Sequence, residues 1–120
     1  MKNGNLIRDK SYAFAIRIIR LSKDLSSKQE FLISRQIARS GRSIGANIEE
    51  AQGGATKREF FARITTAHRE ARETLYWLRL LKDCEMIDLQ TNQSLQDDCE
   101  ELIRMLSAAQ KTIKEQLANP

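Results

Sequence analysis

Residues Leu95–Ile113 read LQDDCEELIRMLSAAQKTI, and the apolar positions in this stretch recur at helical spacing. These positions, separated by steps of 4, 3, 4, 3 and 4, are Leu95, Cys99, Leu102, Leu106, Ala109 and Ile113. Such steps are typical of the a/d seam of a helix that packs at a shallow angle along its neighbours. With Thr91 or Asn92 as its N-cap, this helix is predicted to cover residues 92–117.

Three further helices are predicted upstream, over residues 9–25, 28–52 and 57–83, because each range carries an apolar stripe. The stripes are Phe14, Ile18, Leu21 and Leu25; then Ile33, Ile37, Ile44 and Ile48; and then Phe60, Ile64, Ala67, Ala71, Leu75 and Leu78. Capping boxes, Ser27 with Glu30 and Thr56 with Glu59, indicate where the second and third helices begin. Gly53-Gly54 indicates where the second ends. Short connections favour antiparallel neighbours, so the sequence predicts an all-α, up-down-up-down four-helix bundle forming one domain over residues 1–120.

The composition matches a folded globular protein, with 41% hydrophobic and 30% charged residues in a chain of 120. No stretch reaches the ~20 apolar residues of a membrane span, and residues 1–10 lack the apolar run of a signal peptide. We therefore expect a cytoplasmic protein without a membrane partner. Cys84 and Cys99 lack metal-binding spacing, and we expect both to be small buried hydrophobes.

Two of the predicted helices carry apolar residues that lie off their core stripes. Tyr12, Ile16 and Ile19 form a second stripe about half a turn from the first, and Tyr76 and Leu80 do the same on the third helix. A single bundle cannot bury both sides of these helices. The five residues therefore predict a homo-oligomer interface, which Trp77 helps to fill.

Catalysis finds no support in the sequence. The single histidine, His68, follows Thr65 where a di-metal bundle would have a Glu-x-x-His motif, and no Gly-x-Ser-x-Gly turn occurs. His68 is expected to be a hydrogen-bonded boundary residue, and Gly41 and Gly45 to allow close helix packing. The prediction is a protein with no enzymatic activity, no catalytic residues, no metal or cofactor and no small-molecule substrate.

Basic residues concentrate in the first two predicted helices. Residues 1–48 hold ten Lys and Arg against three Asp and Glu, a balance of +7, while residues 49–120 hold ten against thirteen, a balance of −3. The candidate nucleic-acid-binding residues are Arg17, Arg20, Lys23, Arg35, Arg39 and Arg42. Guanidinium groups pair bidentately with phosphate oxygens, so such a set could follow an RNA or DNA backbone without reading bases.

Two alternatives stay open for these side chains. They could form an ordinary solvated face, or they could pair with Glu49 and with acidic residues of another protein. In the second case the chain would be a protein–protein interaction scaffold with no nucleic-acid role. Glu70 and Glu73 are expected to be solvated or to pair with nearby arginines such as Arg69 and Arg72.

Two stretches, RSGRSIGANIEEA at residues 39–51 and EARETLYWL at residues 70–78, resemble a known family. They are similar to the four-helix-bundle proteins encoded by intervening sequences of bacterial 23S ribosomal RNA genes, a family related to the accessory variability protein of diversity-generating retroelements. The resemblance implies a barrel-like homopentamer with a basic surface, for which binding of structured RNA or DNA is the proposed role. The positions that match the family signature are Arg39, Ser43, Asn47, Glu50 and Glu73.

Overall fold

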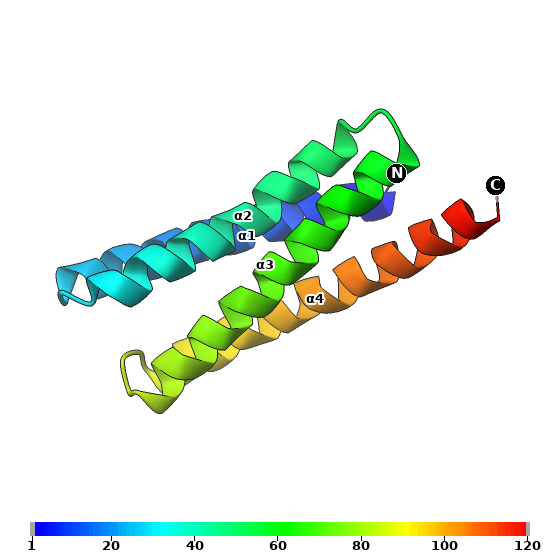
Figure 1. Cartoon of the computed structure of the whole chain (residues 1–120). Helices are drawn as coiled ribbons and strands as arrows, with labels where there is room; N and C mark the ends of the chain where they lie inside the picture. The colour runs from blue at the N-terminus through cyan, green and yellow to red at the C-terminus, as the bar shows by residue number, and fades with distance from the viewer. Residues whose placement is uncertain (1, 120) are drawn as a thin grey trace.

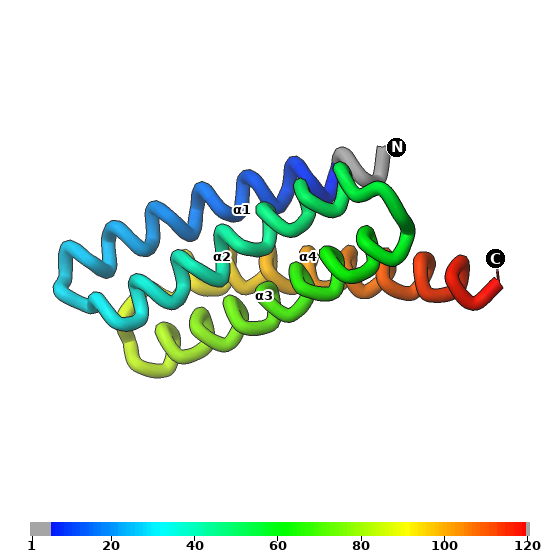
Figure 2. The backbone as a smooth tube through the Cα atoms, turned by 45° about the horizontal axis from the view of Figure 1, so that its top comes forward, coloured from blue at the N-terminus to red at the C-terminus, as the bar shows by residue number. Residues whose placement is uncertain are grey.

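The chain forms four long helices, described here by a computed structural model that covers the backbone of residues 2–119 and the side chains of residues 6–119. The helices are α1 (Lys2–Ser27), α2 (Phe31–Gln52), α3 (Lys57–Asp83) and α4 (Leu89–Ala118) (Figure 1). Successive helices run antiparallel, and α1 begins at the end of the bundle where α4 finishes (Figure 2). The predicted all-α four-helix bundle is confirmed.

The helices pack as two hairpins joined along α2 and α3. Each helix packs extensively on the next one in the chain, whereas α1 and α4 share a much smaller contact. Within residues 2–119, α1 and α3 do not pack on each other, and neither do α2 and α4, so each of these pairs is diagonally opposed. The result is an elongated molecule of 51 × 22 × 20 Å.

The predicted apolar stripes form the core. Phe14 and Ile18 of α1, Ile44 of α2, and Leu78 and Leu102 of α3 and α4 are at most 2% exposed. The stripes weaken at their margins, where Ile33, Phe60, Leu75, Ala109 and Ile113 are only partly buried. Ile7 is also buried, so the α1 stripe continues one turn beyond the predicted helix start.

Gly41 and Gly45 of α2 both face α1, yet they differ in how closely α1 approaches. A Cβ atom on Gly41 would lie 2.5 Å from Cγ2 of Ile18, which is closer than packed atoms allow. A Cβ on Gly45 would lie 3.5 Å from the carbonyl oxygen of Ser11, an ordinary contact. The predicted close packing therefore depends on Gly41 alone.

Three of the predicted helix starts are wrong: α1 begins at Lys2 instead of residue 9, and the starts of α2 and α4 are displaced by local hydrogen bonds. Ser27 is the last residue of α1, and its hydroxyl donates to the carbonyl oxygen of Asp24 instead of capping α2. The chain then turns through Gln29, whose φ is 65°, and the amide of Glu30 donates to the carbonyl oxygen of Leu25. Because this is the hydrogen-bond pattern of a helix C-terminus, Ser27 and Glu30 belong to the end of α1, and α2 begins only at Phe31.

The start of α4 is also displaced, because Asp88 is its N-cap and accepts a hydrogen bond from the Thr91 amide at 2.9 Å. Asn92 is instead buried inside the helix, and its side-chain amide donates to the Leu78 carbonyl oxygen at 2.7 Å. At the start of α3 the predicted Thr56 cap is confirmed, since its hydroxyl accepts from the Glu59 amide. The predicted ends of α2 and α3 are confirmed as well.

Candidate nucleic-acid interface

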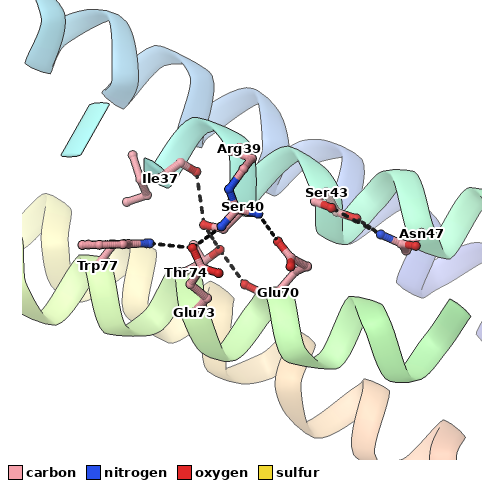
Figure 3. A network of polar contacts seen from close by, with 9 residues as sticks. All are labelled: Ile37, Arg39, Ser40, Ser43, Asn47, Glu70, Glu73, Thr74 and Trp77. Carbon is pink, nitrogen blue, oxygen red and sulfur yellow. Dashed lines mark hydrogen bonds and ion pairs between the residues drawn. The ribbon is translucent and has the colours of Figure 1, made fainter. Parts of the chain in front are cut away.

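Arg39 joins α2 to α3 through two carboxylates (Figure 3). Its Nη1 donates to Oε2 of Glu70 at 2.9 Å, and its Nη2 donates to Oε2 of Glu73. The same Glu73 oxygen accepts a hydrogen bond from the indole Nε1 of Trp77 at 2.9 Å. The guanidinium of Arg39 is therefore occupied within the bundle.

Arg39 and Glu73 each stabilise the charged form of the other. The hydrogen bond to Glu73 raises the pKa of Arg39, although partial burial opposes the shift. Partial burial would raise the pKa of Glu73, but the hydrogen bonds from Trp77 and Arg39 outweigh it, and the net pKa is lowered. Both groups consequently keep their charges at neutral pH, and Arg39 is held by the fold instead of being offered to a ligand.

A buried pair of hydroxyl groups lies beside this ion pair, between the same two helices. Thr74 and Ser40 are fully buried, and their hydroxyl oxygens are 2.8 Å apart. The Thr74 hydroxyl also lies 2.8 Å from the Glu70 carbonyl oxygen, and that of Ser40 lies 3.5 Å from the Ile37 carbonyl oxygen. Throughout residues 6–119, no buried side-chain nitrogen or oxygen lacks a partner.

The other signature positions continue along the same side of α2. The Asn47 side chain donates to the Ser43 carbonyl oxygen at 2.9 Å and accepts from Arg63 of α3 at 3.5 Å. Glu50 is exposed, and its carboxylate has no partner among the described side chains. Three of the five signature residues, Arg39, Asn47 and Glu73, thus connect α2 with α3, while Ser43 bonds only to Asn47 within α2.

The structure divides the six predicted nucleic-acid-binding residues into two groups. Arg17 faces α4 and pairs with Asp98 at 2.6 Å, while Arg39 faces α3. The remaining four, which are exposed or largely so and form no ion pair with any described residue, are Arg20, Lys23, Arg35 and Arg42. Glu49, considered above as a partner for the α2 arginines, pairs with Arg8 at 3.3 Å instead.

A second group of arginines, which sequence reasoning missed, lies on the outer face of α3. Arg69, Arg72 and Arg79 surround the exposed Tyr76 and line an open depression of about 430 Å³. Glu70 and Glu73 were expected to be solvated or to pair with nearby arginines such as Arg69 and Arg72, and both pair with an arginine of another helix, Arg39 of α2. The sequence does carry a signal for this group, because residues 69, 72, 76 and 79 are separated by steps of 3, 4 and 3, which place them on one face of a helix.

The predicted oligomer-interface residues do not form one surface. Tyr12, Ile16 and Ile19 are exposed on α1, with Tyr12 67% exposed. Tyr76 is exposed on α3, which is diagonally opposed to α1, and Leu80 beside it is partly buried. Trp77 is partly buried against the core of its own chain, and its place in a subunit interface stays a prediction.

The other side chains that could take part in chemistry are His68 and the two cysteines. His68 Nε2 lies 3.0 Å from the Ser107 hydroxyl, and burial, together with the charge of Arg72, lowers the pKa of His68. Cys99 is buried, and burial, with smaller effects of Glu100 and Asp98, raises its pKa to about 12. Cys84 was expected to be buried, but it is exposed because it is the C-cap of α3. No group of three metal-ligating side chains occurs among the described residues.

None of the helices in the described part of the chain is long and apolar enough to span a bilayer. A family model, that of the 23S rRNA-intervening sequence protein, matches residues 4–108. The chain belongs to the 23S rRNA-intervening sequence protein family. The resemblance found in the two quoted stretches is thereby confirmed over most of the chain.

A solved structure of an S23 ribosomal protein family member from Bacteroides thetaiotaomicron, described as a protein with unknown function, is similar throughout. It is 41% identical in sequence, has a TM-score of 0.87, and the match covers 91% of this chain and 98% of that one. No curated protein matches this chain. The fold and the family of this intervening-sequence protein are thus shown.

Proposed function

We propose that this member of the 23S rRNA-intervening sequence protein family is a non-enzymatic, homo-oligomeric bundle that binds the backbone of RNA or DNA. The observation that carries the proposal is the pair Arg35 and Arg42 on α2. Both are exposed and, among the described side chains, neither meets a carboxylate, whereas Arg8, Arg17 and Arg39 are all paired. Uncompensated guanidinium groups on a rigid helix attract phosphates.

Self-association through α1 is part of the proposal. Tyr12, Ile16 and Ile19 expose apolar surface on one side of α1, and a second copy that covered them would remove this surface from water. The net charge of +4 is modest for a nucleic-acid binder. An assembly of several copies would bind one nucleic acid through several weak contacts at once, which raises the overall affinity. The family resemblance suggests five copies.

Nucleic-acid binding is tested by titrating labelled RNA and DNA with the protein at low ionic strength. Affinity is expected to fall steeply with salt, and to fall further in the variant Arg35→Glu/Arg42→Glu. Arg39 is left intact because its loss would disturb the α2–α3 contact. The matched control, Lys111→Glu/Lys114→Glu, makes the same charge change on exposed residues of α4. No binding by the wild-type protein, or equal losses in both variants, would contradict the proposal.

Self-association is tested by light scattering. Ile19→Glu is expected to lower the measured mass, because a carboxylate would have to be buried in the subunit contact. Leu32→Glu is the control, since Leu32 of α2 is also exposed and apolar but lies outside the α1 stripe. A wild-type mass equal to one chain would refute this part of the proposal. Protein partners that survive nuclease treatment, without any nucleic acid, would favour a scaffold.

A further inference from the structure

We infer that the outer face of α3 is a binding site for single-stranded nucleic acid, in which Tyr76 stacks on a base and Arg69, Arg72 and Arg79 contact the flanking phosphates. This inference rests on the proposed function and deepens it. The set is called the α3 ridge below. It differs from the pair Arg35 and Arg42 because it combines cations with an exposed aromatic ring, and an aromatic ring can contact bases as well as backbone.

The α3 ridge is continuous along one side of the helix. Its residues follow each other at steps of 3, 4 and 3, so their side chains lie in one row. Ten residues of helix separate Arg69 from Arg79, a length of about 15 Å. Phosphates are about 3.4 Å apart along a stacked strand and further apart along an unstacked one, so the row spans at most about four nucleotides.

The three arginines of the ridge form no ion pair among the described residues, and for Arg69 and Arg72 this is because Arg39 takes the two nearby carboxylates. Glu70 and Glu73 are neighbours of Arg69 and Arg72 in sequence, but both turn to Arg39 of α2. Glu73 lines the depression around Tyr76, yet its carboxylate already accepts from Arg39 and Trp77. In the described part of the chain, no ion pair involves Arg69, Arg72 or Arg79, so the ridge presents net positive charge.

The ring of Tyr76 is held in place from one side. Its centroid lies 5.2 Å from that of Trp77, with an angle of 67° between the planes, and Trp77 is fixed by its hydrogen bond to Glu73. Tyr76 nevertheless remains 52% exposed. A ring that is positioned in advance but open to solvent can stack on a base with little loss of side-chain entropy.

The surroundings of Tyr76 favour a polyanion over a second copy of the chain. The centres of subunit interfaces are depleted in charged residues, and here three unpaired guanidinium groups surround one ring. The α1 stripe differs because three exposed apolar residues, Tyr12, Ile16 and Ile19, lie together there, and it remains the proposed subunit contact although Arg20 and Lys23 lie one turn beyond Ile16 and Ile19. A single strand is the expected ligand because its bases are unstacked and accessible, while those of a duplex are not.

The test compares an unstructured oligonucleotide of about ten nucleotides with a fully paired duplex of similar length, each as RNA and as DNA, by fluorescence anisotropy. Tyr76→Leu keeps an apolar side chain but removes the ring. It is expected to weaken binding of the single strand about 5- to 100-fold and to change duplex binding by no more than about twofold. Tyr76→Phe retains the ring and is expected to bind the single strand like the wild type.

The arginines are tested by the salt dependence of single-strand binding. Arg72→Gln/Arg79→Gln is expected to reduce the slope of log K against log salt by about 1.4, since each phosphate contact on a single strand contributes about 0.7. Lys111→Gln/Lys114→Gln is the charge-matched control, and it should leave the slope nearly unchanged. Circular dichroism and light scattering on each variant establish that fold and mass are retained.

Different experimental results would contradict the inference and the proposed function. If the wild type binds nucleic acid but Tyr76→Leu weakens binding of the single strand and of the duplex equally, or weakens neither, the α3 ridge is not a single-strand site, although the proposed function stands. A change of mass in Tyr76→Leu would place Tyr76 in a subunit contact and would likewise overturn the inference. If the wild type binds no nucleic acid, the proposed function itself fails.

Discussion

Helix α2 meets its two neighbours in different ways. Toward α1 it presents Gly41, where Ile18 leaves no room for a Cβ atom. Toward α3 it presents the buried Ser40, which meets Thr74, and the partly exposed Arg39, which pairs with Glu70 and Glu73. At these mid-helix positions the α1–α2 contact depends on shape and the α2–α3 contact on polar pairing, although the hydroxyl groups of Ser22, Ser26 and Ser34 also join α1 to the first turns of α2. The difference predicts which substitutions each contact will tolerate.

The largest effect is expected at Gly41. Gly41→Leu should lower the free energy of unfolding by about 3 kcal/mol, because a side chain must be forced between α2 and Ile18. Gly41→Ala should cost about 1 to 2 kcal/mol, since overpacking outweighs the better helix propensity of alanine. Urea denaturation measures both values.

Gly45→Ala is the matched control on the same helix. The new methyl group would meet the Ser11 backbone at an ordinary contact distance, so the gain in helix propensity should dominate. We expect the free energy of unfolding to rise by up to about 1 kcal/mol. If Gly41→Ala and Gly45→Ala changed the free energy of unfolding in the same direction, the packing of α1 on α2 would not depend on the close approach at Gly41.

The next effect in size concerns the hydroxyl pair of the α2–α3 contact. Thr74→Val keeps the volume but deprives Ser40 of its close partner, and we expect a loss of about 1 to 2 kcal/mol. Adding Ser40→Ala should recover part of the loss, because removing both partners leaves no unsatisfied hydroxyl group. A double-mutant cycle by thermal or urea denaturation measures this coupling, and strictly additive losses would exclude it.

Most of the fold could be predicted because apolar periodicity reports directly on burial. Ile18, Ile44 and Leu102 were assigned to the core from spacing alone, and each is at most 1% exposed. The start of α2 could not be predicted from residue types, because Ser27 and Glu30 carry the letters of a capping box at the end of a helix. Only the φ of Gln29 and the hydrogen bond from Glu30 to Leu25 distinguish the two cases.

The candidate site was predictable in composition but not in pairing. The sequence places Arg39 on α2 and Glu73 on α3, while the rotation of the two helices about their axes decides that these side chains meet. That rotation depends on the whole core and leaves no local signal. The α3 ridge was missed for the same reason, since Arg69 and Arg72 appeared to have carboxylate partners beside them.

A smaller effect is expected for the ion pair of the α2–α3 contact. Arg39 is 44% exposed in its side chain and Glu73 is 33% exposed, so solvent screens their interaction. We expect Arg39→Gln to lower the free energy of unfolding by about 1 kcal/mol or less. Arg42→Gln, the control, alters an exposed arginine without an ion pair among the described residues and should have almost no effect. A loss of several kcal/mol for Arg39→Gln would show that the polar contact outweighs the shape contact at Gly41.

The smallest effect is the pH dependence of the same contact. Because the pKa of Glu73 in the folded chain lies below its ordinary value of 4.5, the folded state binds the proton less readily than the unfolded state. The stability that Glu73 contributes is therefore complete above pH 4.5, and it is lost as the pH falls through the lower folded-state pKa. The difference in free energy of unfolding between wild type and Glu73→Gln should accordingly shrink as the pH is lowered from neutrality. Gly41→Ala, which changes no titrating group, should keep a constant difference from wild type over the same range. A Glu73→Gln difference that stayed equally constant would mean that the carboxylate gains nothing from Arg39 and Trp77.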